Sequence, residues 1–146
     1  MAMHISNMNQ LQAALMPTMV KMVDELAERV YETLNYFLQE YYNSYDPKSY
    51  QRQYDFLRSA VKVEPKIKGS KVTTSVYIDT ESMDNYYNAT GFQVASWANQ
   101  GLHGGLNAGS KTPHVWDDTM DNTVNNGELL KLAVDYLRSK GISVRV

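Results

Sequence analysis

Apolar and polar positions alternate with helical spacing over the first third of the chain. From Met19 to Tyr41, long apolar side chains recur every three or four residues and form one stripe, while charged residues such as Glu25 and Glu32 fall on the opposite face. The stripe predicts a helix over residues 17–43, roughly 40 Å long at about 1.5 Å per residue. That length exceeds what a small domain usually needs to cover its own sheet. Part of the helix is therefore expected to serve a neighbouring subunit.

The pattern then changes at a turn. Residues 43–47 break the helix, because the residue before Pro47 is disfavoured in helical conformation and Asn, Ser and Asp supply local turn bonds. Aromatic residues at helical spacing predict a short second helix from Lys48 to about Ser59.

A hairpin is predicted between residues 61 and 79. Two runs of alternating apolar and polar residues flank Gly69-Ser70, which is typical of a two-residue turn with glycine first. The alternation predicts that Lys62 lies on the wet face of the first strand. Pro65 cannot donate a ladder hydrogen bond, so that strand is expected at an edge or with this position facing away from a partner.

The rest of the chain contains further helical and strand signals. The periodicity predicts a polar loop over 80–91, a short helix over 92–99 that ends at Gly101, and a flexible loop over 101–112. A last helix opens at residues 125–128, Gly141 caps it, and the alternation over 142–146 predicts a terminal strand. Residues 114–125 are expected to be partly buried, without an assigned element.

These elements predict one α+β domain over residues 17–146, preceded by an arm over residues 1–16. A long N-terminal helix and a short second helix pack on a small, mainly antiparallel sheet, followed by the C-terminal helix and strand. The arm is expected to be flexible or only conditionally ordered, because Pro17 fits a helix best in its first turn.

Charge and composition narrow the function. The net charge of −2 offers no basic field that would attract nucleic acid or an anionic membrane. The absence of cysteine excludes a disulfide framework and thiolate catalysis and fits synthesis in a reducing cytoplasm. No apolar run approaches the roughly 18–20 residues of a membrane span, and the start lacks the pattern of a secretory signal. The 11 tyrosines, which are amphipathic, hint at subunit contacts.

Two groups of residues suggest chemistry without establishing it. The loop 104–112 nearly matches a phosphate-binding loop, but Ser110 stands where the lysine must follow the last glycine, so a mobile glycine-rich loop is favoured. A second group consists of metal-ligating residue types that lack the spacing of a known site: His103, His114, Asp117 and Asp118. We predict no catalytic, cofactor or metal site. A small metal-dependent hydrolase or nuclease that uses the second group stays open as the alternative, and the sequence neither supports nor excludes a toxin- or immunity-like partner protein.

Residues 45–59, YDPKSYQRQYDFLRS, carry a family resemblance. They resemble the Tyr-x-Pro-x-x-Tyr-x-Arg-Thr-x-x-Leu-x-x-Ser segment of tailed-bacteriophage neck and tail-completion proteins, which there follows a long helix and leads into a hairpin. Gln53 departs from the usual threonine. Residues 98–105 and 113–119 are similar to the loop before the final helix of such proteins. The matching positions are Tyr45, Pro47, Tyr50, Arg52, Leu57 and Ser59.

The resemblance implies a structural, non-enzymatic virion protein without a cofactor. Such a protein is made in the host cytoplasm and forms a homo-oligomeric ring at the head–tail junction. It contacts the portal or adaptor on one side and the tail-tube or tail-terminator proteins on the other, while DNA passes through without sequence-specific binding. Since ring interfaces join two different patches of neighbouring subunits, we expect the first helix and the hairpin to supply them. The tyrosines of residues 45–54 are expected to pack between helix and sheet. The interface candidates are Tyr45, Tyr50, Arg52, Tyr54, Lys66, Lys68 and Lys71.

Overall fold

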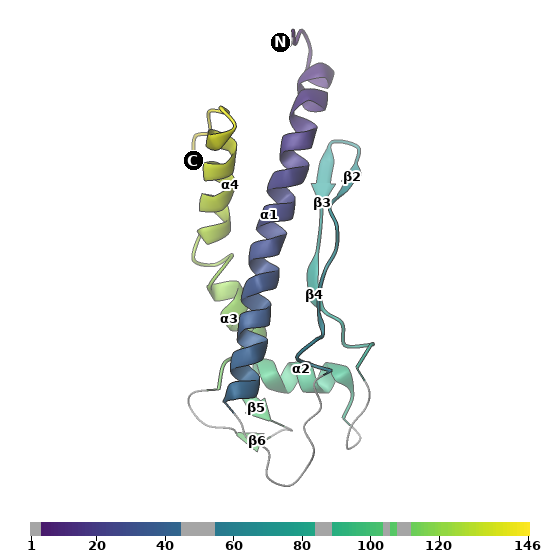
Figure 1. Ribbon diagram of the computed structural model, residues 1–146, viewed down its shortest axis with the longest axis vertical. Coiled ribbons are helices and arrows are strands. Elements are labelled where there is room, and N and C mark those ends of the chain that lie inside the picture. Colours follow the sequence, from purple (N-terminus) through teal and green to yellow (C-terminus); the bar gives the residue numbers. More distant parts are fainter. Residues whose placement is uncertain (1–3, 45–54, 84–88, 104–105, 108–111) are drawn as a thin grey trace.

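One long helix organises the molecule. The computed structural model describes residues 4–44, 55–83, 89–103, 106–107 and 112–146. Helix α1 (Met8–Asn43) runs along most of the length of the molecule, with α3 (Val115–Asp121) and α4 (Glu128–Ser139) on one side and a β-hairpin on the other (Figure 1). Helix α2 (Gly91–Asn99) lies at its C-terminal end. The predicted α+β class is confirmed. In the described ranges, none of the helices is long and apolar enough to cross a membrane.

Helix α1 begins earlier than the sequence predicted. Asn7 caps it by accepting a hydrogen bond from the Gln10 backbone N–H, and the helix then continues through Pro17 for 36 residues, about 54 Å. The start predicted at Pro17 is therefore wrong, and residues 8–16 of the predicted arm are helical. A proline removes one backbone donor and crowds the preceding turn. The cap and the helical turns on both sides of it nevertheless keep the helix continuous here.

The hairpin is built from four short strands. β1 (Ala60–Lys62) pairs with β4 (Val76–Ile78), and β2 (Lys66–Lys68) pairs with β3 (Lys71–Thr73), both antiparallel. Gly69 opens the turn with a φ of 61°, so the predicted hairpin with glycine first is confirmed.

A one-residue bulge separates the two halves of the hairpin. The Val63 N–H donates to the Ser75 carbonyl, and the next register pair is Lys66 with Thr73, so Glu64 and Pro65 lie opposite Thr74 alone. Bulges of this kind tolerate a proline, because the extra residue is left out of the ladder.

The bulge reverses which residues of the first strand face α1. In β1, Ala60 and Lys62 pair with Ile78 and Val76 on the helix side, so Lys62 lies against α1. The prediction that Lys62 belongs to the wet face is wrong for this reason. A shift of one residue in register transfers every side chain of a strand to the other face.

The later elements follow the sequence in part. Helix α2 is confirmed, with a capping box at Thr90 and Gln93, and α4 is confirmed with Gly141 at a φ of 79°. The Gly141 and Ile142 N–H groups donate to Arg138 and Leu137, the Schellman pattern of helix ends.

Other sequence predictions are wrong or concern residues outside the described ranges. The loop predicted over 101–112 contains a short ladder of β5 (Leu102–His103) and β6 (Leu106–Asn107). Residues 142–146 form no strand, because no neighbouring strand pairs with them in the described parts of the chain. In the second predicted helix, residues 45–54 lie outside the described residues, and residues 55–58 form turns rather than helix.

The core surrounds the C-terminal third of α1. Leu34 and Leu38 are fully buried, and Tyr41 makes edge-to-face contacts with Tyr42 and Phe56. The Tyr41 hydroxyl donates to the Leu102 carbonyl at 2.6 Å, which joins the end of α1 to β5. The buried cluster is completed by residues of the hairpin, the segment after it, α2 and α3: Ala60, Met83, Ala98 and Val115.

Candidate assembly surfaces

The apolar stripe of α1 continues beyond the core. Met22 is the first buried residue of the helix, whereas Met8, four turns earlier on the same side, is 77% exposed. Residues 5–20 contain no Asp, Glu, Lys or Arg. Leu11, Leu15 and Met19 continue the stripe with partial exposure on a segment that extends past the end of α4 (Figure 1). This N-terminal stripe, from Met8 to Met19, is therefore apolar, uncharged and only partly covered.

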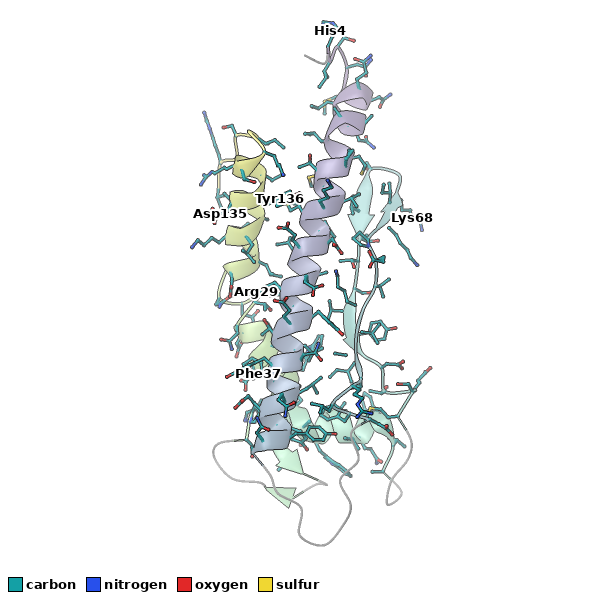
Figure 2. All side chains as sticks on the ribbon, viewed as in Figure 1. His4, Arg29, Phe37, Lys68, Asp135 and Tyr136 are labelled. Atoms are coloured by element: carbon teal, nitrogen blue, oxygen red, sulfur yellow. The ribbon has the colours of Figure 1, made fainter. Side chains whose placement is uncertain are left out.

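The hairpin tip, residues 66–71, is a second exposed surface. Lys66, Lys68 and Lys71 are exposed, and Ile67 is 57% exposed between them. Lys68 extends outward from the tip (Figure 2), and its cross-strand partner in the register is Lys71. Like charges directly opposite each other destabilise a strand pair. The tip thus concentrates positive charge that the free subunit does not offset within its described residues.

The base of the hairpin is held to α1 by an ion pair. The Lys62 ammonium lies 2.7 Å from Asp24 Oδ1 and 2.9 Å from Glu28 Oε2, and its side chain is only 15% exposed. These hydrogen bonds to Asp24 and Glu28 raise the pKa of Lys62 above its ordinary value, against the opposing effect of burial. Lys62 also lies opposite the buried Asp24 Oδ1, whose negative charge would otherwise be uncompensated. The tip therefore extends from a base with a fixed position on the helix.

A groove lies on the other side of α1, between α1 and α4. Its volume is about 250 Å³, below the roughly 300–1,000 Å³ of small-molecule sites. Apolar side chains and charged groups share its lining, and Arg29 in it pairs with Glu128 at the start of α4. Figure 2 shows Arg29 and Tyr136 in the space between the two helices. The lining residues are Met22, Glu25, Leu26, Glu28, Arg29, Glu32, Leu132 and Tyr136.

The predicted interface candidates divide into two sets. Lys66, Lys68 and Lys71 are brought together at the exposed tip, as described above. The others, Tyr45, Tyr50, Arg52 and Tyr54, lie outside the described residues, as does the expected packing of these tyrosines between helix and sheet. The groove between α1 and α4 was not predicted, because its existence depends on how α4 packs against α1. Only the run of glutamates on one face of α1 signalled it in the sequence.

The metal-ligating residue types serve structural roles where they are described. His114 Nδ1 lies 2.9 Å from the Asn99 carbonyl oxygen, and Asp118 Oδ2 accepts a hydrogen bond from the His114 backbone N–H. The Asp117 backbone N–H donates to Asn99 Oδ1. The two contacts to Asn99 join α3 to α2. No group of three or more potential ligands occurs in the described ranges, which exclude the His103 side chain and most of the glycine-rich loop 104–112.

Comparisons with known proteins identify a family. Searches of curated proteins and of solved structures match nothing. The sequence model of the family named YomN matches residues 7–139, from the N-cap of α1 to the last residue of α4. The match covers the hairpin and all the described helices. The chain therefore belongs to the YomN family.

Proposed function

We propose that this protein is a structural component of the phage neck, which assembles into a ring at the head–tail junction and joins the portal or adaptor to the tail tube. The segment 45–59 supports the proposal through its resemblance to neck and tail-completion proteins, as does the phage-derived name of the family. The observation that carries it is the N-terminal stripe of α1. The apolar stripe of this long helix continues beyond the part that the rest of the subunit covers, which suits it to packing against another subunit.

The strength of such packing can be bounded. Burying a Leu or Met side chain contributes about 1.5–3 kcal/mol, so Met8, Leu11, Leu15 and Met19 together contribute on the order of 6–12 kcal/mol if fully buried. They are already partly covered, which lowers this figure. Association costs about 4–15 kcal/mol of lost translational and rotational freedom. The stripe alone therefore supports weak association in solution and tight assembly only on a preformed ring such as the portal.

The experiment tests assembly and location in the virion together. A phage that encodes an epitope-tagged chain is examined by immunogold electron microscopy, and a phage that lacks the gene is examined for unjoined heads and tails. We expect label at the neck, and separate heads and tails in the deletion. Neighbouring genes for capsid, adaptor and tail-tube proteins are a further expected observation. Joined, infectious particles without the gene, with no label on the virion, would contradict the proposal.

A matched pair of substitutions isolates the N-terminal stripe. Leu15→Glu places a charge in the stripe, whereas Ala13→Glu places the same charge on the exposed opposite side of the same turn. Phage that carry Leu15→Glu should yield unjoined heads and tails, while Ala13→Glu phage should remain infectious. Circular dichroism of both purified variants should give the same helix content, so that unfolding does not explain the difference.

A further inference from the structure

The hairpin tip and the α1–α4 groove have opposite charge. Between residues 60 and 78 the only carboxylate is Glu64, against the exposed lysines 66, 68 and 71. The groove carries Glu25, Glu28 and Glu32 on α1, and its one arginine, Arg29, is already paired with Glu128. Since Glu28 binds Lys62, Glu25 and Glu32 are the groove carboxylates for which the described residues show no ion pair.

Each cluster is unfavourable in the isolated subunit. Glu28 lies three residues after Glu25 and four before Glu32, so neighbouring carboxylates repel along one helix face, and Lys62 offsets the charge of Glu28 alone. At the tip, Lys68 and Lys71 are direct cross-strand partners of like charge. Contact between the two clusters would relieve the repulsion in both.

The apolar parts of the two surfaces also correspond. Ile67 is exposed at the tip, and the groove is lined by Met22, Leu26, Leu132 and Tyr136 together with its carboxylates. The groove volume of about 250 Å³ is small for a cofactor but suits an inserted side chain or two. The tip and the groove thus both combine apolar side chains with charged groups, and the charges of the two surfaces are opposite in sign.

We infer that the hairpin tip of one subunit docks in the α1–α4 groove of a second copy of this chain. The hairpin and α4 lie on opposite sides of α1 (Figure 1), so a subunit cannot fill its own groove. The contact joins two different patches and is therefore heterologous, the type that closes into rings. This inference rests on the proposed ring and assigns the surfaces that hold it together.

The tip contact alone is small. Residues 66–71 are far fewer than the roughly 20–30 residues that each partner contributes to a standard interface. The contact should therefore be weak in solution and should weaken further with added salt, because exposed charges are screened.

Cross-linking at high concentration detects a weak contact. The chain has no cysteine, so single cysteines can be introduced by Ile67→Cys at the tip and Leu132→Cys in the groove. The two variants are mixed at about 1 mM, where even a contact with a Kd near 1 mM is substantially populated, and are joined with a short bis-maleimide. Asp135→Cys replaces the groove cysteine in the control, because Asp135 is exposed on the outer side of α4 (Figure 2). A covalent dimer is expected from the tip–groove mixture and not from the control.

Charge exchange provides the decisive measurement. The double variants Lys68→Glu/Lys71→Glu and Glu25→Lys/Glu32→Lys, each combined with both cysteines, should cross-link at least about tenfold less when alone, because like charges then meet. An equimolar mixture of the two should regain cross-linking, since between the two variants a reversed tip meets a reversed groove and an unchanged tip meets an unchanged groove. Circular dichroism of each variant should match that of the wild type, so that misfolding does not explain the lower cross-linking yield.

The outcomes separate the inference from the proposed function. Equal yields in the control, or reversed charges without effect on the yield, would overturn the docking. Neck labelling together with that result would leave the ring in place with other contact surfaces. Tip–groove cross-links in a protein absent from virions would instead refute the neck assignment and retain the docking.

Discussion

Replacing Lys62 with methionine tests how the hairpin is attached to the helix. Methionine keeps the length and apolar stem of the lysine but removes the charge that lies 2.7 Å from Asp24 and 2.9 Å from Glu28. We expect the free energy of unfolding to fall by about 2 kcal/mol, because Asp24 Oδ1 is then left buried without a compensating cation, a loss of about 1–3 kcal/mol.

The exposure of the partners sets the upper limit. The Asp24 and Glu28 side chains are 42% and 46% exposed, so water can solvate much of each carboxylate once the lysine is gone. The loss should therefore stay below the roughly 3–5 kcal/mol of breaking a fully buried pair. Combining Lys62→Met with Asp24→Asn should recover part of the loss, with a coupling of about 1 kcal/mol.

Urea unfolding followed by circular dichroism measures these free energies. Lys68→Met is the matched control, because Lys68 is exposed at the tip and should stay within about 0.5 kcal/mol of wild type. A change of less than about 0.5 kcal/mol for Lys62→Met would refute the reasoning and place the ion pair among surface pairs without measurable effect.

The pH dependence of stability in the alkaline range measures the contribution of Lys62 in a second way. The pKa of Lys62 is raised in the folded state above its ordinary value of 10.5. Its contribution to stability is therefore fully present below the pKa of the unfolded chain and is lost as pH rises through the folded pKa. The stability difference between wild type and Lys62→Met should be constant from pH 7 to about 10 and should shrink above it.

Three further substitutions test the packing and the backbone. Leu34→Ala should lower the free energy of unfolding by about 3 kcal/mol, as measured by urea denaturation, because the side chain is fully buried in the core. Gly91→Ala should cost about 2 kcal/mol or more in the same assay, because an added Cβ would lie 2.0 Å from the Thr80 carbonyl oxygen, and a smaller loss would show that α2 shifts freely. Pro17→Ala should restore a backbone hydrogen bond within α1 and slow amide hydrogen exchange over residues 8–16, and unchanged exchange would show that the proline does not limit helix stability there.

The helices were predictable where local chemistry decides them. The apolar stripe of α4 and the glycine after it fixed that helix, and Gly141 adopts the left-handed conformation that such a cap requires. Helix α3 was missed because two of the fully buried side chains in and just after it, Thr119 and Thr123, are polar residue types and add nothing to an apolar stripe. Their hydroxyls donate to the backbone carbonyls four residues earlier, Val115 and Thr119, so burial leaves neither donor unsatisfied.

The predictions that failed depended on partners distant in the sequence. Alternation over residues 142–146 is a strand pattern, yet a strand forms only where another strand supplies hydrogen bonds. The face occupied by Lys62 depends on the register of β1 against β4, which a single extra residue reverses. The groove likewise exists only because α4 packs along α1, so its residues could not be grouped in advance.

The extra residue at Glu64-Pro65 has a consequence for sequence comparison within the family. Two residues stand there opposite Thr74 alone, so the strand has one alternation before the bulge and the inverse alternation after it. A relative that lacks one of these two residues should carry the opposite order of charged and apolar positions on one side of the deletion. In such a relative, apolar residues would stand where this chain has charged ones, and charged residues where this chain has apolar ones. An alignment without the one-residue gap would then score matching strand positions as mismatches.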